Sequence, residues 1–159
     1  MCGIVGGFWR DKSPRYSDLI QDSLRFLEHR GPDDSGISLM DVPAGTLAVG
    51  HRRLSIIDLS HRGHQPMFLA DKTLGIVYNG EVYNYREIRK ELRSQNWTFE
   101  TETDSEVLLK AWAEWGSECL VRLEGMFAFA VVDLTTLTMT CVRDAFGIKP
   151  FFFSNDQDR

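Results

Sequence analysis

A cysteine at position 2 is the residue in this sequence with the clearest capacity for chemistry. Cys2 follows the initiator methionine, and a small second residue favours removal of Met1, which would leave a thiol and a free α-amine on one residue. The reference pKa of an α-amine is about 7.7–8.0, so the amine is partly neutral at physiological pH and can accept the thiol proton. Cys2 could then supply both a nucleophile and its base. The alternative is a cysteine that only packs in an edge strand.

Two further stretches contain residue types that bind a carboxylate or an oxyanion. Arg52 and Arg53 enter an apolar segment, and a guanidinium can hold a carboxylate through two parallel hydrogen bonds. A solvated pair at a strand end is the alternative. Asn79 and Gly80 could direct a side-chain amide and a backbone N–H at one oxygen, as an oxyanion hole requires. The same dipeptide is also typical of a tight turn.

Two charged stretches allow both a functional and a structural interpretation. Asp104 lies in Glu-Thr-Asp-Ser-Glu at 102–106, where it could receive the ammonium of a ligand. Acidic residues are also common at a helix N-terminus, which favours a structural role. The segment Arg-Asp-Ala-Phe-Gly-Ile-Lys-Pro at 143–150 could by itself be a charged surface loop.

The composition is that of a soluble globular protein. The 159 residues are enough for one domain with a core, with 43% hydrophobic and 26% charged residues. A net charge of −5 argues against a nucleic-acid-binding surface, and no apolar run approaches the roughly 18 residues of a membrane span. A signal peptide is not recognisable. We therefore expect a cytoplasmic protein with no contact to nucleic acid or membrane.

The cysteines and histidines do not indicate a disulfide framework or a metal site. Cys2, Cys119 and Cys141 are odd in number and widely spaced, and none of the histidines stands at zinc-ligand spacing with them. We interpret Cys119 and Cys141 as small buried hydrophobic residues. His51 is interpreted as a loop or strand-end residue and Arg52 as a surface neighbour of Arg53.

The hydrophobic pattern predicts alternating strands and helices. A helix is expected from Ser17, as N-cap, to about Arg30, and capping boxes at Asn84 and Thr103 predict two more helices. Strands are expected at 2–9, 47–50, 55–58, 73–78, 126–132 and 138–142, with a turn at 79–80. The strand at 126–132 is apolar on both faces and needs a covering layer on each side. These elements predict an α+β fold, a four-layer αββα sandwich of two mostly antiparallel sheets flanked by helices.

Seven segments, taken together in order and spacing, resemble the glutaminase domain of class II glutamine amidotransferases, which are N-terminal-nucleophile hydrolases. The resemblance spans Cys2 to about Phe153 and is nearest to the glutamine-hydrolysing asparagine synthetase branch. The segments are Met-Cys-Gly-Ile-Val-Gly at 1–6, His-Arg-Gly-Pro-Asp at 29–33, Arg-Leu-Ser-Ile-Ile-Asp at 53–58, Asn-Gly-Glu at 79–81, Thr-Asp-Ser-Glu at 103–106, Leu-Glu-Gly-Met-Phe-Ala-Phe-Ala at 123–130 and Arg-Asp-x-x-Gly-x-Lys-Pro at 143–150. The run Phe151-Phe152-Phe153 stands where the family often has Leu-Tyr-Tyr, a difference that affects packing.

The resemblance implies a role for each matched residue. Cys2 attacks the side-chain amide of glutamine with its own amine as base, while Asn79 and Gly80 hold the oxyanion. The implied glutamine-binding residues are Arg53 for the α-carboxylate, Asp104 with Glu81 for the α-ammonium, Leu54, Ser55, Ile56 and Ile57 along the pocket wall, and Asn79 and Gly80.

The resemblance also implies partners. A glutaminase domain over residues 2–159 would use L-glutamine, no metal and no cofactor. ATP and Mg²⁺ would belong to a covalently linked C-terminal synthetase domain, and the whole protein could be a homodimer. Two alternatives stay open: the same glutaminase serving a sugar, phosphoribosyl or natural-product acid acceptor, and a non-catalytic glutamine-binding module.

Overall fold

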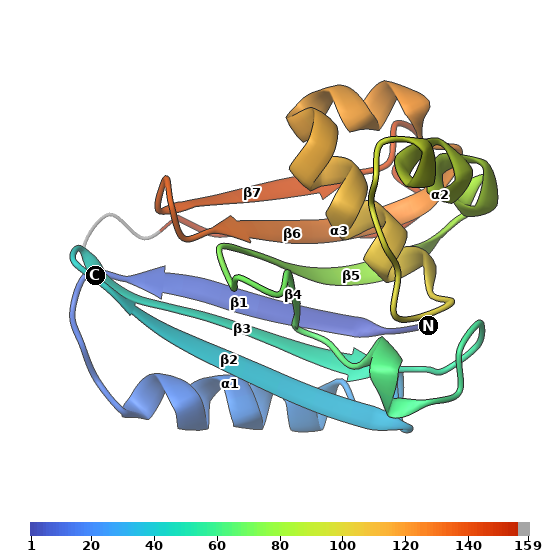
Figure 1. Ribbon diagram of the computed structural model, residues 1–159. Helices are drawn as coiled ribbons and strands as arrows, with labels where there is room; N and C mark the ends of the chain where they lie inside the picture. Colours follow the sequence, from blue (N-terminus) through green and yellow to red (C-terminus); the bar gives the residue numbers. More distant parts are fainter. Residues whose placement is uncertain (156–159) are drawn as a thin grey trace.

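Two antiparallel sheets lie face to face between outer layers of helix in the computed structural model, which describes residues 1–155 (Figure 1). The first sheet has the order β1-β3-β2, with β1 at Gly3–Trp9, β2 at Asp34–Val42 and β3 at Gly45–Arg53. The second has the order β4-β5-β6-β7, with β4 at Met67–Phe68, β5 at Leu74–Val82, β6 at Gly125–Asp133 and β7 at Thr138–Arg143. The expected αββα sandwich is confirmed.

The helices cover the outer faces of the two sheets. Helix α1 (Arg15–Phe26) lies on the first sheet, and α2 (Tyr85–Ser94) and α3 (Asp104–Trp115) lie on the second (Figure 1). Two short 3-10 helices, His61–Gly63 and Gly116–Arg122, complete the described elements. No helix among residues 1–155 has the length and apolar character that a membrane crossing demands.

Three apolar clusters form the core, one at each boundary between layers. Ala48 on β3 packs against Ile20 and Leu24 of α1, while Leu47 and Val49 face the second sheet. On β6, residues 127, 129 and 131 pack beneath α2 and α3, and residues 130 and 132 meet the first sheet. The prediction that this strand is covered on both faces is therefore confirmed.

The expected turn at Asn79-Gly80 is wrong, because both residues lie inside β5. This strand continues to Val82, with Asn79 opposite Ala128 and Gly80 opposite Phe127 of β6. A Cβ added at Gly80 would stand 2.4 Å from the Met126 carbonyl oxygen, so the glycine permits close approach of the two strands. The turn propensity of the dipeptide is overridden by nine consecutive cross-strand pairs.

Other strand predictions need correction. The segment 55–58 is not a strand but part of a loop, and β3 is longer than the predicted 47–50. The strand β2 was not predicted. Cys141 on the edge strand β7 is exposed and not buried, whereas Cys119 is fully buried as expected.

The helix ends also differ from the predictions. Helix α1 begins at Arg15 with Pro14 as N-cap, so Ser17 lies inside it, and the helix ends at Phe26. Asn84 precedes α2 but its side chain bonds the Arg122 carbonyl and the Glu124 N–H, not the helix terminus. Only half of the capping box at α3 forms. The Thr103 hydroxyl accepts the Glu106 N–H at 3.2 Å, but the Glu106 carboxylate accepts the N–H groups of Glu100 and Thr101 and not that of Thr103.

Replacing Phe129 tests the position of the core. Phe129 is fully buried and meets the Trp112 ring edge-on at 5.9 Å between centroids. We expect Phe129→Ala to lower the free energy of unfolding by about 3–5 kcal/mol in urea titrations. Phe26→Ala is the matched control, since Phe26 is 81% exposed, and should stay within about 0.5 kcal/mol of the wild type. Equal effects of the two substitutions would contradict this assignment of the core.

Candidate active site

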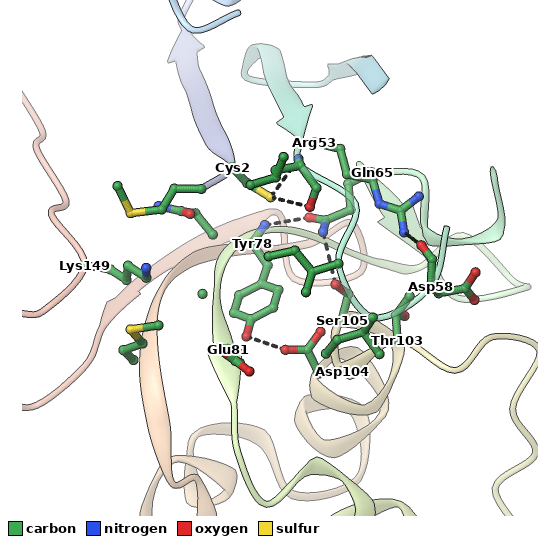
Figure 2. Close-up of a pocket in the computed structure, with 17 residues that line it drawn as sticks. Cys2, Arg53, Asp58, Gln65, Tyr78, Glu81, Thr103, Asp104, Ser105 and Lys149 are labelled. Carbon is green, nitrogen blue, oxygen red and sulfur yellow. Dashed lines mark hydrogen bonds between the residues drawn. The ribbon is translucent and has the colours of Figure 1, made fainter. Parts of the chain in front are cut away.

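The predicted site residues converge on one pocket at the end of the sandwich where the chain begins (Figure 2). Ser55 is the exception. Its N–H donates to the Asp33 carboxylate at 2.7 Å, and the residue lines a neighbouring depression. The predicted residues that line the pocket are Cys2, Arg53, Leu54, Ile56, Ile57, Asn79, Gly80, Glu81 and Asp104.

The pairing of β1 with β3 positions Cys2. Gly3 lies opposite Arg52, so the register brings Cys2 alongside the end of β3. The Leu54 N–H donates to the Cys2 sulfur at 3.4 Å, and Arg30 Nε donates to the Cys2 carbonyl at 3.2 Å. Burial raises the pKa of the Cys2 thiol, and the Leu54 N–H and the charges of the N-terminus and Arg53 oppose this only in part. The thiol is thus held in place but needs a base to become a nucleophile.

The backbone N–H of Gly80 points toward the open edge of β5, away from β6. The Phe127 N–H donates to the Asp144 carboxylate, and the Phe127 carbonyl accepts the Asp144 N–H. Both hydrogen bonds lie on the β7 side of β6. Its pair with Gly80 is therefore a non-hydrogen-bonded pair, and the Gly80 backbone groups face the opposite side of β5. This side carries the pocket with Cys2. Gly80 can therefore donate to an oxygen bound there.

Asp104, the first residue of α3, supplies a buried carboxylate to the pocket. Its Oδ2 accepts the Tyr78 hydroxyl at 2.7 Å (Figure 2). The same oxygen accepts the Val82 N–H at 3.1 Å. Burial raises the pKa of Asp104, and these two hydrogen bonds offset only part of this rise. A bound cation would favour the charged form, so this position suits a ligand ammonium.

Arg53 both lines the pocket and stabilises one of its walls. The buried guanidinium donates to the Ser60 carbonyl at 2.7 Å and to the Asp58 carbonyl, which fixes the loop after β3. An arginine carries five N–H donors, so these two bonds leave others for a carboxylate.

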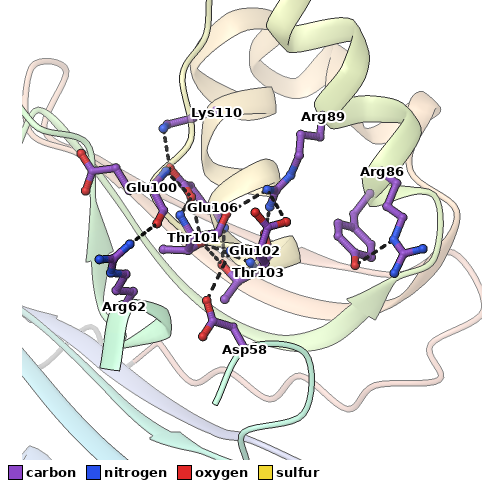
Figure 3. Close-up of polar contacts among 11 residues, drawn as sticks. Asp58, Arg62, Arg86, Arg89, Glu100, Thr101, Glu102, Thr103, Glu106 and Lys110 are labelled. Atoms are coloured by element: carbon purple, nitrogen blue, oxygen red, sulfur yellow. Dashed lines mark hydrogen bonds and ion pairs between the residues drawn. The ribbon is translucent and has the colours of Figure 1, made fainter. Parts of the chain in front are cut away.

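Arg89 stabilises the segment that leads into α3 through hydrogen bonds to its backbone (Figure 3). Its buried guanidinium donates to the Thr101 carbonyl at 2.9 Å and the Thr103 carbonyl at 3.1 Å. The Glu106 carboxylate accepts the N–H groups of Glu100 and Thr101 from the other side. The position of Asp104 therefore depends on a network of buried polar groups outside the pocket.

Several pocket residues were not predicted from the sequence. Lys149 is 6% exposed and reaches the pocket from the 143–150 segment, which Asp144 and Arg143 fold by bonding its backbone. The motif could have indicated Lys149, but nothing local indicates the others. The other unpredicted lining residues are Met1, Asp58, Gln65, Tyr78, Thr103, Ser105 and Met126.

His51 lies near the end of β3, as interpreted, whereas Arg52 is less exposed than the surface residue we expected. His51 is fully buried between the sheets, and burial lowers its pKa to about 4, so the ring is neutral. Arg52 is partly buried and lies 3.0 Å from the Glu28 carboxylate. Among residues 1–155, no three side chains of His, Cys, Asp or Glu come together as metal ligands.

The fold and the site define a class of protein in which a cysteine next to the N-terminus opens onto a pocket at the end of an αββα sandwich. The family model described as "Glutamine amidotransferase domain" matches residues 1–159, and the chain belongs to this family. A Mycobacterium tuberculosis protein provisionally named asparagine synthetase (glutamine-hydrolyzing) is 46% identical over 97% of this chain and 25% of its own length. Asparagine synthetase (glutamine-hydrolyzing) 1 of Bacillus subtilis is 40% identical over the whole chain and 25% of its own length.

The chain thus spans about a quarter of the length of the relatives it matches. A solved structure of glutamine phosphoribosylpyrophosphate amidotransferase from B. subtilis, complexed with ADP and GMP, has the same fold. The TM-score is 0.73 at 21% identity, over 93% of this chain and 38% of that one.

The pH dependence of Cys2 alkylation tests the environment of the thiol. Because burial raises its pKa, less thiolate is present at neutral pH than for an exposed cysteine. In protein that retains Met1, we expect the iodoacetamide rate at Cys2, followed by peptide mass spectrometry, to rise at higher pH than that of free cysteine. A midpoint at or below that of free cysteine would contradict the described burial.

Proposed function

We propose that this domain hydrolyses the side-chain amide of L-glutamine through a thioester on Cys2. The observation that carries the proposal is the convergence of the Cys2 thiol, the outward-facing Gly80 N–H and the Asp104 carboxylate on one pocket. Membership of the glutamine amidotransferase family supports the same chemistry.

The reaction starts from a chain whose Met1 has been removed. The free α-amine of Cys2 takes the thiol proton, and the sulfur attacks the amide carbon of glutamine. The Asn79 side-chain amide and the Gly80 N–H stabilise the negative oxygen of the tetrahedral intermediate. The C–N bond then breaks, and the leaving nitrogen takes the proton from the α-ammonium and departs as ammonia.

Hydrolysis of the thioester completes the cycle. Water gives a proton to the α-amine and attacks the thioester carbon, and the same two donors hold the oxyanion. Breaking the C–S bond returns the proton to sulfur and releases glutamate. Burial of Cys2 favours the neutral thiol in the resting state, so the thiol needs a base to remove its proton. The α-amine of the same residue is such a base.

Glutamine is held at both of its charged groups. Arg53 binds the α-carboxylate through the donors that its loop contacts leave, and Asp104, assisted by Glu81, binds the α-ammonium. Leu54, Ile56 and Ile57, which line the pocket, contact the rest of the substrate. The raised pKa of Asp104 supports this assignment, because a substrate ammonium offsets the cost of a buried carboxylate.

We further propose that the ammonia serves asparagine synthesis from aspartate, in a C-terminal synthetase domain that uses ATP and Mg²⁺. The names and the greater length of the relatives support this acceptor. An amidotransferase that acts on a phosphoribosyl compound shares only the fold, so that alternative has weaker support. A cytoplasmic location fits the same proposal.

Replacing Cys2 separates an enzyme from a glutamine-binding module. We expect Cys2→Ala, in the complete natural polypeptide that contains residues 1–159, to lower glutaminase activity by at least about 1,000-fold, because nucleophile loss removes the covalent route. Ammonia release from glutamine is the measurement. Cys141→Ala is the matched control, since Cys141 is exposed on β7 outside the pocket, and should retain full activity. Undiminished hydrolysis by Cys2→Ala would exclude Cys2 as the nucleophile, and a wild type that binds glutamine without hydrolysing it would favour the module.

A further inference from the structure

Among residues 1–155, no strand pairs with the pocket-facing edge of β5 where the reaction would occur. Strand β4 has only two residues, and it pairs with Gly75 and Ile76 of β5. Beyond Ile76, the backbone groups of Tyr78, Gly80 and Val82 face this edge, because alternate residues of a strand point the same way. Their positions must therefore be maintained by side chains from elsewhere in the fold.

Gln65 bonds this edge just before the proposed oxyanion hole (Figure 2). The Tyr78 N–H donates to Gln65 Oε1 at 2.7 Å, and Gln65 Nε2 donates to the Ser105 hydroxyl at 3.1 Å. Gln65 is only 3% exposed, and Ser105 lies in the first turn of α3, next to Asp104. A single side chain thus connects the strand that carries Gly80 to the helix that carries the Asp104 carboxylate.

The carbonyl of Tyr78 is held from the first sheet. His51 Nε2 lies 3.0 Å from this oxygen, and a carbonyl can only accept, so the neutral ring donates from Nε2. Four residues along the strand, the Val82 N–H donates to Asp104 at 3.1 Å. Gly80 therefore lies midway between two fixed backbone positions on the same edge.

We propose that Gln65 is a positioning residue for the oxyanion hole, which keeps the edge of β5 in register with α3 so that the Gly80 N–H points at the reacting carbonyl. This inference rests on the proposed glutaminase function. Gln65 lines the pocket, but both hydrogen bonds of its side chain go to Tyr78 and Ser105, so it acts through these two residues. Without its amide the buried Tyr78 N–H loses its partner, and the strand edge must move to find another.

The test compares Gln65→Met with Gln65→Glu in the complete natural polypeptide. Methionine keeps the length and removes both hydrogen bonds, whereas glutamate keeps an acceptor for the Tyr78 N–H and can accept from the Ser105 hydroxyl. Gln21→Met is the matched control, because Gln21 is exposed on α1. Each variant is assayed for kcat and KM with glutamine and for the rate of Cys2 alkylation by iodoacetamide, a displacement that forms no oxyanion.

A misdirected oxyanion donor affects only the acyl-transfer steps. Loss of one such donor costs about 100–1,000-fold in kcat, so we expect Gln65→Met to lower kcat at least 10-fold. KM should change less than about threefold and the alkylation rate less than about twofold, since substrate binding and the thiol are not altered. Gln65→Glu should recover most of the kcat, and Gln21→Met should equal the wild type.

Other results overturn the inference. A kcat of Gln65→Met within about twofold of the wild type, or a parallel loss of kcat and alkylation, would show that Gln65 has no selective effect on the oxyanion step. If Gln65→Met does not fold, Ser105→Ala takes its place, because it removes only the anchor of the Gln65 amide. An unchanged kcat in Ser105→Ala then contradicts the proposal. A wild type without glutaminase activity would instead refute the proposed function.

Discussion

The antiparallel pairing of β1 with β3 is the contact on which the rest of the site depends. Seven consecutive residue pairs fix the start of the chain to the central strand of the first sheet, and the first of them places Gly3 opposite Arg52. Cys2 therefore lies at the end of β3, where the Leu54 N–H reaches its sulfur. A terminal residue is usually mobile unless a sheet holds it, so a nucleophile at position 2 requires this strand.

The second sheet contributes its open edge. An unpaired strand edge is a liability in most proteins, because its N–H and C=O groups can pair with another chain. Here side chains of Gln65, His51 and Asp104 form hydrogen bonds with the backbone groups of Tyr78 and Val82. Between them, Gly80 lines the pocket. The fold thus uses an incomplete sheet to present one backbone donor to a bound ligand.

The features predictable from the sequence were those with a strong local signal. The apolar run in β6 indicated a strand covered on both faces. The order and spacing of the seven motifs indicated nine of the residues that line the pocket. Strand β2 was missed because its sequence, Asp-Ser-Gly-Ile-Ser-Leu-Met-Asp-Val, contains residues that disfavour strands and is specified by pairing with β3. The local turn propensity of Asn79-Gly80 predicts a turn. Its strand conformation could not be predicted locally, because it depends on pairing with β6, almost 50 residues away. Gln65 has no local signal, since its role consists only of contacts with Tyr78 and Ser105.

In the proposed mechanism, Cys2 attacks glutamine only when its own α-amine is free to take the thiol proton. The most direct measurement is mass spectrometry of the N-terminal peptide after the protein is mixed with glutamine and quenched in acid. We expect a γ-glutamyl adduct on Cys2 in chains that lack Met1, and no adduct in chains that retain it. An equal yield of the adduct on chains that retain Met1 would show that the free α-amine is not required, and an adduct on a different residue would show that Cys2 is not the nucleophile.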